Sequence, residues 1–173
     1  GCDRATRLVE QLLTLARLES AAQAPNDPVD LAHVAREVLA ELAPGALAHG
    51  QSLELDADGA WPVRGSATLL SVLLRNLADN ALRYGGNGVR VVVALAHEDG
   101  HIVLRVDDSG PGLSDEQRSH LGERFFRVLG TAAPGSGLGW SIVRRIAAVH
   151  DSTIETARSE ALGGLAVRVR FPA

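Results

Sequence analysis

The chain has few aromatic residues and a single cysteine, and each scarcity narrows the range of proteins it can be. Aromatic residues make up 3% of its 173 residues, so the hydrophobic core must be built from Leu, Val, Ile and Ala. Cys2 has no second cysteine to pair with, which excludes an internal disulfide and suits a reducing compartment. No hydrophobic run approaches the roughly 18 residues of a transmembrane helix, and no signal peptide is recognisable.

Charge and length narrow the class further. The formal net charge is −4, which is unfavourable for a nucleic-acid-binding face, so we expect no nucleic-acid partner. With 46% hydrophobic and 22% charged residues, the composition is that of a globular protein of about one domain with a short appendage. Because the chain begins with glycine rather than methionine, we expect a fragment of a longer protein.

The first residues carry a helical pattern that two prolines end. Four leucines recur at helical spacing in a broad stripe, which is typical of a helix in a bundle: Leu8, Leu12, Leu15 and Leu18. Pro25 and Pro28 cannot continue that helix. We therefore predict a helical segment in residues 1–24, a linker in 25–28 and a second domain in 29–173.

Residues typical of caps and turns divide the second domain into short elements. They are Asp30, Ser66, Gly85-Gly86, Glu98-Asp99-Gly100 and the capping box of Ser114 and Gln117. Helices are expected over residues 30–48, 66–84 and 138–149, and strands over 51–56, 61–64, 89–97, 101–107, 153–157 and 165–171. Strands and helices mix without a regular strand–helix–strand repeat, so we predict an α+β sandwich with one mostly antiparallel sheet.

The helix that follows Ser66 carries an unusual polar stripe. Five residues at steps of three or four lie on one face: Leu69, Leu73, Asn76, Asn80 and Tyr84. Arg83 falls beside this stripe. A half-buried amide without partners costs about 1–3 kcal/mol, so the two asparagines suggest an oxygen-rich ligand such as a phosphate with its metal. A solvated helix face or an internal hydrogen-bond network would explain the same residues.

Two glycine patterns follow further along the chain. Asp108-x-Gly110-x-Gly112 comes directly after an apolar strand, where a sharp turn or a close backbone approach to a ligand needs glycine. Gly135-Ser136-Gly137-Leu138-Gly139 precedes a helix, whose free N–H groups suit an anion. The second pattern lacks the Gly-Lys-Ser/Thr of a P-loop and the spacing of a dinucleotide fingerprint. Taken singly, each pattern is also compatible with a plain turn or a flexible loop.

Together and in this order, the three patterns resemble the asparagine box and the two glycine boxes of the sensor histidine kinases. Glu123-Arg124-Phe125-Phe126-Arg127, between the glycine patterns, looks like that family's phenylalanine box. Residues 3–18 resemble the second helix of its dimerisation and phosphoacceptor domain. That helix and residues 122–127 (GERFFR) are most similar to the QseC-like branch.

The resemblance implies a fold and an activity. The fold is the Bergerat-type ATP-binding sandwich, in which a mixed, mainly antiparallel sheet packs on three helices, here preceded by one N-terminal helix. The implied cofactors are ATP and Mg²⁺. The γ-phosphoryl group would pass to a histidine in the phosphoacceptor domain of the same protein, a homodimer when intact, and then to the receiver domain of a response regulator. The chain would be the cytoplasmic domain of a bacterial inner-membrane sensor, linked to the membrane only through upstream segments.

The resemblance also assigns roles to residues. Asn76 is implied to coordinate Mg²⁺, Asn80 to bind phosphate or metal-bound water, and Arg83 to pair with phosphate, so these three are the implied catalytic residues. Tyr84 would pack near the adenine or ribose. Asp108 would accept a hydrogen bond from the adenine amino group and so select ATP over GTP. The other implied nucleotide contacts are Gly110, Gly112, Arg127, Ser136, Gly137, Leu138 and Gly139; for Arg127 the acceptor domain is the alternative.

Two features depart from the family pattern. Trp140 stands where relatives usually carry Leu; we expect it to pack in the core, with a reshaped nucleotide lid as the alternative. No histidine lies in the sequence context of a phosphoacceptor box, so we expect none of the six to be catalytic: His33, His49, His97, His101, His120 and His150. His150 ends a helix, where a cation is favourable.

Two other functions share parts of this pattern. The ATPase modules of chaperones, topoisomerases and mismatch-repair proteins have similar boxes but hydrolyse ATP with a carboxylate one turn before the asparagine. Residues 72–75 are Val, Leu, Leu and Arg, which disfavours hydrolysis. A binding-only domain that scaffolds a phosphatase is disfavoured because all four boxes are intact.

Overall fold

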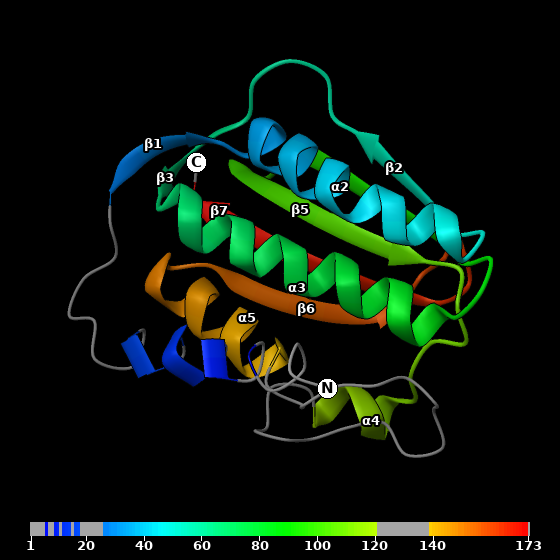
Figure 1. The fold of residues 1–173 in the computed structure, drawn as a ribbon. Helices are drawn as coiled ribbons and strands as arrows, with labels where there is room; N and C mark the ends of the chain where they lie inside the picture. The colour runs from blue at the N-terminus through cyan, green and yellow to red at the C-terminus, as the bar shows by residue number, and fades with distance from the viewer. Residues whose placement is uncertain are drawn as a thin grey trace.

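A five-stranded sheet forms one layer of the protein (Figure 1). The computed structural model describes residues 6, 9, 10, 12–14, 16, 17, 26–120 and 139–172. In spatial order the strands are β2 (Ser52–Asp56), β4 (Arg90–Glu98), β5 (His101–Asp108), β7 (Leu165–Pro172) and β6 (Thr153–Arg158). β2 runs parallel to β4, and the other neighbouring pairs are antiparallel. The predicted mixed, mainly antiparallel sheet is therefore confirmed.

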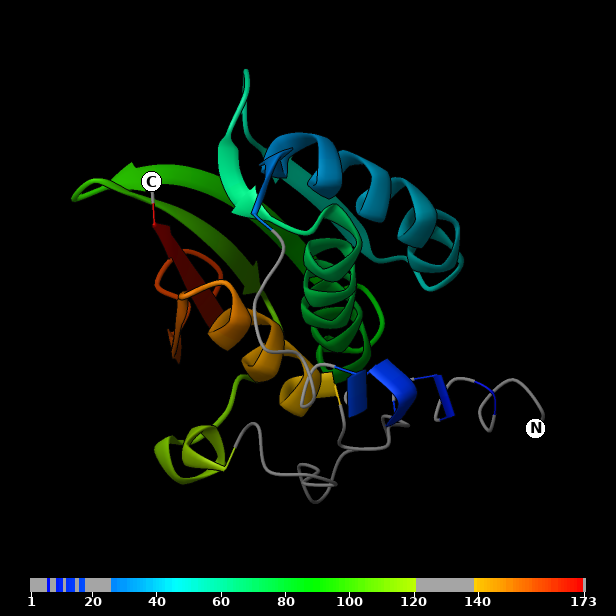
Figure 2. The ribbon, with the colours of Figure 1, turned by 90° about the vertical axis from the view of Figure 1, so that its left-hand side faces the viewer.

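Three helices cover one face of this sheet, and Figure 2 shows them together on that side. They are α2 (Leu31–Ala48), α3 (Ala67–Gly85) and α5 (Gly139–Val149). Alternate residues of β4, such as Val91 and Val93, are fully buried in the core between the layers, as expected for a strand with one covered face. Among the described residues, Phe171 is the one aromatic side chain in the buried core, so the expected aliphatic core is also confirmed.

The predicted caps and turns lie where the elements begin and end. The Asp30 side chain accepts a hydrogen bond from the backbone N–H of Ala32 at the start of α2. Ser66 does the same for Leu69 at the start of α3. The turn between β4 and β5 consists of Asp99 and Gly100, both at positive φ (50° and 75°), as a two-residue hairpin loop requires.

The short helix α4 (Asp115–Ser119) begins with the predicted capping box. The backbone N–H of Gln117 donates to Ser114 Oγ at 3.1 Å, and the Gln117 side chain accepts from the backbone N–H of Ser114 at 2.9 Å. None of the described helices is long and apolar enough to cross a membrane.

A second, two-stranded sheet is an element that the sequence did not predict. β1 (Asp27–Asp30) pairs antiparallel with β3 (Pro62–Gly65), so part of the segment predicted as a linker is a strand. Its prolines indicated a break in the helix, but a proline is also tolerated on an edge strand, where no ladder bond needs its nitrogen. The pairing partner lies about 35 residues away along the chain, which local sequence patterns do not reveal.

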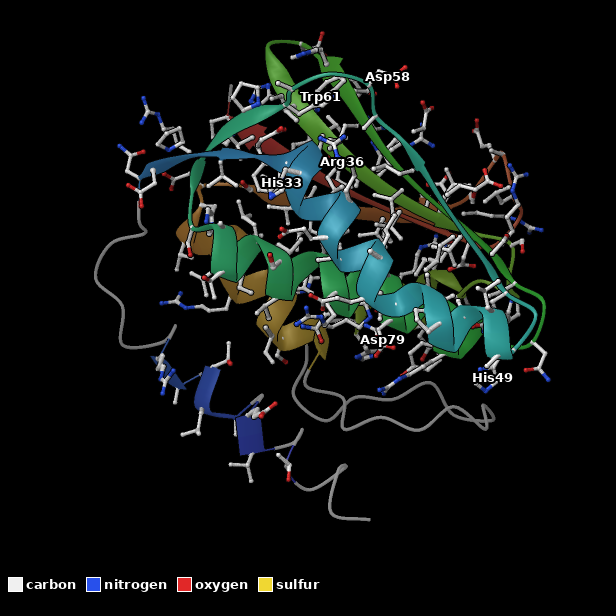
Figure 3. All side chains as sticks on the ribbon, turned by 45° about the horizontal axis from the view of Figure 1, so that its top comes forward. His33, Arg36, His49, Asp58, Trp61 and Asp79 are labelled. Carbon is white, nitrogen blue, oxygen red and sulfur yellow. The ribbon has the colours of Figure 1, made fainter. Side chains whose placement is uncertain are left out.

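His150 differs from the expected helix-end cation. Its side chain is buried, with 6% of the residue exposed. Nε2 accepts a hydrogen bond from the backbone N–H of Ser66 at 3.1 Å, and Nδ1 lies 2.7 Å from the carbonyl oxygen of Ile146. This arrangement requires a neutral imidazole with its hydrogen on Nδ1. His150 therefore joins the end of α5 to the start of α3. The exposed side chains of His33 and His49 (Figure 3) contact only nearby residues of α2, Glu37 and Gly45, in the described bonds.

Candidate functional site

An apolar groove lies among α3, β5, β7 and the start of α5. Its cavity volume is about 40 Å³, and the groove is partly open to solvent. Four predicted site residues line it: Asn80, Tyr84, Asp108 and Gly112. The remaining lining residues are Leu77, Ala81, Val106, Pro111, Leu113, Trp140, Leu165 and Val167. The groove thus offers a largely apolar wall with a few polar groups, which suits a planar organic ligand.

Asp108 is the one charged residue among those that line the groove in the described part of the chain. It ends β5, and 6% of it is exposed. Its Oδ1 accepts hydrogen bonds from the backbone N–H groups of Gly110 at 2.9 Å and Leu165 at 3.2 Å. Among the described residues no group donates to Oδ2. One carboxylate oxygen is therefore held by the backbone, and the other remains available to a donor on a ligand.

Burial raises the pKa of Asp108 above its ordinary value of 3.8. The hydrogen bonds from Gly110 and Leu165 act in the opposite direction because they favour the charged form, and the neighbouring Asp107 charge adds to the increase. A ligand that donates a hydrogen bond to the carboxylate would stabilise its ionised form. The site is therefore built to prefer a hydrogen-bond donor at this position.

The loop between β6 and β7 is attached to two adjacent aspartates. On one side, the buried Ser159 donates from Oγ to Asp107 Oδ2 at 3.1 Å. On the other, the backbone N–H of Gly164 donates to the carbonyl oxygen of Asp108 at 3.0 Å. A Cβ on Gly164 would lie 2.1 Å from Asp108 Oδ1, so no larger residue can take this place. Gly164 is a site residue that the sequence analysis missed.

The glycines of the Asp108-x-Gly110-x-Gly112 pattern have different reasons to be glycine. A Cβ on Gly110 would lie 2.7 Å from the Cα of Gly85, so the turn packs directly on the end of α3. Gly112 has a φ of +73°, a conformation that other residues rarely adopt. Both observations show a sharp and closely packed turn, one of the two reasons predicted for glycine here, rather than a simple flexible loop.

Beside the groove, the start of α5 packs against the two asparagines of α3. A Cβ on Gly139 would lie 3.0 Å from Asn76 Oδ1 and 3.5 Å from Asn80 Nδ2. The Asn76 amide donates from Nδ2 to the carbonyl oxygen of Val72 at 2.8 Å. That bond turns Oδ1, the oxygen, toward Gly139. Gly139, the one described residue of the third sequence pattern, therefore packs beside the two asparagines of the first pattern.

Arg83 forms an ion pair within α3. Its Nε lies 3.1 Å from Asp79 Oδ2, and 24% of the Arg83 side chain and 32% of the Asp79 side chain are exposed. Asp79 also lines a second, more polar cavity together with Asn76 and Arg75 of α3 and Glu10 of the N-terminal segment. The cationic side chain predicted to meet phosphate is thus held near the asparagines by an acidic neighbour.

Comparison with known proteins gives the family. Residues 65–173 match the family described as "Histidine kinase-, DNA gyrase B-, and HSP90-like ATPase". The chain belongs to this ATPase family. Every residue that lines the groove lies within the matched range. Family membership supports ATP as the ligand of the groove.

Individual relatives of this family member are sensor histidine kinases. The chain is 42% identical over 178 residues to the sensor protein QseC of Salmonella typhi, covering 99% of this chain and 37% of that protein. Its structure is similar to that of the mycobacterial sensor histidine kinase MprB, with a TM-score of 0.77 and 29% identity over 84% of this chain and 97% of that one. It is also similar to full-length ShkA, solved in complex with AMPPNP, with a TM-score of 0.83 and 27% identity over 98% of this chain and 36% of that one.

These comparisons confirm the predicted resemblance to QseC-like sensor histidine kinases and the Bergerat-type α+β fold. The chain spans a little over a third of the length of the curated relatives it matches.

The structure brings together eight of the twelve predicted site residues of this ATPase family member: Asn76, Asn80, Arg83, Tyr84, Asp108, Gly110, Gly112 and Gly139. The other four, Arg127, Ser136, Gly137 and Leu138, lie outside the described residues. Trp140, expected to pack in the core, packs against it and also lines the groove.

Sequence reasoning missed the apolar wall. Leu77 and Ala81 lie beside the asparagine stripe on α3, and their spacing of four residues is a signal that could have placed them near Asn80. Leu165 and Val167 reach the groove because β7 pairs with β5. No local pattern reveals that pairing, so these two residues could not be found from the sequence.

Proposed function

We propose that this chain is the catalytic ATP-binding domain of a sensor histidine kinase, spanning residues 29–173 and preceded by the end of a dimerisation helix in residues 1–24. It would deliver the γ-phosphoryl group of ATP to a histidine of the phosphoacceptor domain in the same protein. The observation that carries the proposal is the convergence of the asparagine helix, the Asp108 turn and Gly139 on one groove.

Asp108 would recognise the adenine base at one end of the site. Its Oδ2, which no described residue uses, can accept a hydrogen bond from the exocyclic amino group of adenine. Guanine presents a carbonyl oxygen at the corresponding position, which a carboxylate would repel. Tyr84, Leu77 and Val106 supply the surrounding apolar surface. The proposal therefore includes selectivity for ATP over GTP.

Mg²⁺ fits the polar end of the site, where oxygen atoms of the protein and of the phosphates would coordinate it together. Mg²⁺ takes oxygen ligands and keeps several waters, so it needs few protein groups when phosphates are present. The described residues contain no cluster of three or more acidic, histidine or cysteine side chains. They do contain Asn76 Oδ1, turned toward Gly139 by the bond from its own amide to Val72. When bound, Mg²⁺ would neutralise phosphate charge.

The side chains near the asparagines have further roles in the proposal. Asn80 would bind phosphate or a metal-bound water, and Arg83 would pair with phosphate, so these two would act with Asn76 as the catalytic residues. Phosphoryl transfer of this kind depends mainly on positioning and charge neutralisation. The phosphohistidine would then pass its phosphoryl group to an aspartate in the receiver domain of a response regulator. The intact kinase would be an inner-membrane homodimer with this domain in the cytoplasm.

A purely hydrolytic ATPase is the competing function within the same family. The relevant chaperone-type modules place a carboxylate one turn before the asparagine. Here Val72 occupies that position, and its carbonyl oxygen is engaged by the Asn76 amide. No described acidic residue of α3 precedes Asn76. The local geometry therefore favours a domain that holds ATP for another acceptor.

Labelling with γ-³²P-ATP tests the proposal. A phosphoacceptor domain from a QseC-like kinase, added as a separate polypeptide, should acquire acid-labile, base-stable phosphate in the presence of this chain, ATP and Mg²⁺. This chain alone should acquire none, because its six histidines have no acceptor context. Steady release of inorganic phosphate without labelling of the acceptor would instead support the hydrolytic function.

A further inference from the structure

We propose that Trp140 is a nucleobase-recognition residue of this domain, with its indole forming an aromatic wall of the groove against the base whose amino group meets Asp108. The inference rests on the proposed function, because it takes ATP as the ligand of the groove. It goes beyond that function by assigning base recognition to a residue outside the predicted site.

The position of Trp140 follows from how α5 begins. Trp140 is the second residue of α5, directly after Gly139. A Cβ on Gly139 would lie 3.0 Å from Asn76 Oδ1 and 3.5 Å from Asn80 Nδ2, so the first turn of α5 packs closely on α3 and cannot move away without breaking that contact. The indole is thereby held at the groove beside Asn80, and both residues line it.

The surroundings of the indole suit contact with a planar ligand. Trp140 is half-buried: one part packs against the hydrophobic core, and another lines the groove. A tryptophan that only filled the core would be enclosed, as Phe171 is with 1% exposed. Among the described lining residues, Tyr84 is the only other aromatic one, and the rest of the wall is mainly aliphatic. An exposed indole surface facing an apolar groove is a stacking surface for a base.

Toward the described residues of the groove, the Trp140 side chain makes no hydrogen bond. The charged group proposed to bind the base is the Asp108 carboxylate, whose Oδ1 already accepts hydrogen bonds from two backbone N–H groups. The indole would add contact area and orientation rather than a second polar contact. Its loss should therefore weaken binding of the base without affecting contacts to the phosphates.

Tryptophan fluorescence tests this directly, because the chain has only two tryptophans. Trp61 does not line the groove; it stacks on His97 with ring centroids 4.6 Å apart. In a Trp61→Phe variant, Trp140 is the only fluorophore of its kind. Saturating ATP should change the emission of this variant and protect it from quenching by acrylamide. In a Trp140→Leu variant, ATP should leave the emission of Trp61 unchanged.

Competition measurements separate base contact from a general effect on the site. Adenosine and tripolyphosphate would each displace a fluorescent ATP analogue from the parent, Trp140→Leu and Trp140→Phe proteins. We expect Trp140→Leu to weaken the binding of adenosine and ATP by about threefold to tenfold and to leave the affinity for tripolyphosphate unchanged. Trp140→Phe should restore most of the loss. Circular dichroism and a thermal melt would verify that each variant is folded.

Three results would overturn the inference: unchanged emission of Trp61→Phe at saturating ATP, adenosine binding by Trp140→Leu equal to that of the parent, or equal losses for adenosine and tripolyphosphate. The fluorescence result does not depend on whether Trp140→Leu folds. Failure of the parent protein to bind ATP in calorimetry would refute the proposed function itself, and is distinguishable from all three.

Discussion

The two ends of the proposed nucleotide site are built differently. At the end formed by Asp108, the functional carboxylate is buried and its position is set by backbone N–H groups and by the packing of Gly164. At the end formed by Asn76 and Arg83, the side chains are partly exposed and are held by bonds within α3 itself. The proposed base end is thus part of the core, whereas the proposed phosphate end consists of partly exposed side chains on α3.

The difference predicts how each end responds to substitution. Backbone and core contacts cannot rearrange without loss of packing, so substitutions that disturb the packing at the base end should affect stability as well as affinity. Partly exposed side chains on a helix surface can reorient, so changes at the phosphate end should act on the ligand and leave folding nearly intact. Each of the following predictions tests this contrast, beginning with the largest expected effect.

Asn76→Asp should abolish most Mg²⁺-dependent ATP binding, a loss of about a hundredfold or more. A carboxylate beside the phosphates would add repulsion and change the geometry of the metal ligands. Titration calorimetry with ATP in Mg²⁺ and in EDTA measures the effect. The melting temperature should shift little, because Asn76 is only half-buried. Equal affinity of the parent protein in Mg²⁺ and in EDTA would refute the metal role.

Gly164→Ala should weaken ATP binding by up to about a hundredfold and reduce the free energy of unfolding by about 2–3 kcal/mol. The added Cβ would lie 2.1 Å from Asp108 Oδ1 and 2.5 Å from its carbonyl oxygen. The loop must therefore shift and lose the bonds that hold the carboxylate. Denaturant unfolding and calorimetry measure the two effects.

Gly163→Ala is the matched control for that substitution. Gly163 has a φ of +90°, but a Cβ there would meet no other atom within 4 Å. Backbone strain should cost about 1 kcal/mol of stability, with ATP affinity nearly unchanged. Similar losses of affinity in the two variants would show that the loop conformation matters and that the contact of Gly164 with Asp108 does not.

The contrast between the two ends also explains what could be predicted from the sequence. Asn76, Asn80 and Arg83 share one helix, so their spacing was enough to place them on one face. Asp108 could be predicted as a strand-end carboxylate with glycines after it. What could not be predicted is what holds Asp108: Leu165 comes from a strand 57 residues later. Contacts in the core come from strands that pair across long stretches of sequence, so they could not be predicted. The positions of side chains along one helix follow from local spacing, so they could.

The same reasoning explains the two structural misreadings outside the site. Residues 27–28 of β1 were predicted as part of a linker because the partner strand is distant in sequence. His150 was expected to be a helix-end cation because only its own helix was considered. Its actual environment includes Gly65, where a Cβ would lie 2.2 Å from the imidazole Cδ2. Helix-end preferences favour exposed charge, but burial against a neighbouring element decides the role here.

Asp108→Asn should weaken ATP binding by about tenfold to a hundredfold, the usual value of a hydrogen bond to a charged acceptor. The asparagine oxygen can still accept the bonds from Gly110 and Leu165, so the fold should be kept. Because burial disfavours the charged form, the neutral side chain should leave stability at neutral pH unchanged or raised. Selectivity between ATP and GTP, measured by competition, should fall in parallel. An unchanged ATP affinity would make Asp108 a turn residue only.

Acidification should weaken ATP binding through the same carboxylate. Burial raises the pKa of Asp108 in the folded protein. As the pH falls, this carboxylate is therefore protonated at a higher pH than an exposed aspartate would be. Affinity should therefore fall as the pH approaches that raised pKa from above, and Asp108→Asn should lack this dependence. Calorimetry of both proteins across the acidic range measures the difference.

The stability of the ligand-free protein should respond to pH with the opposite sign. Above the ordinary value of 3.8 and up to the raised pKa, the folded state binds more protons at Asp108 than the unfolded state does. The contribution of this group to the free energy of unfolding therefore falls as the pH rises through that window. The difference in unfolding free energy between the parent and Asp108→Asn should show this slope. A slope of the opposite sign would mean that the carboxylate is not desolvated.

The smallest effect is expected from Asp79→Asn, which removes the acidic partner of Arg83. The pair is partly exposed, so it is worth a fraction of a kcal/mol in stability. Removal of a negative charge near the phosphates should increase ATP affinity by about twofold to threefold. Asp56→Asn, at the exposed end of β2, is the matched control for the change in net charge and should have no effect. A marked loss of affinity in Asp79→Asn would instead mean that Arg83 must be held by Asp79 to meet the nucleotide, so that the phosphate end is as rigidly positioned as the base end.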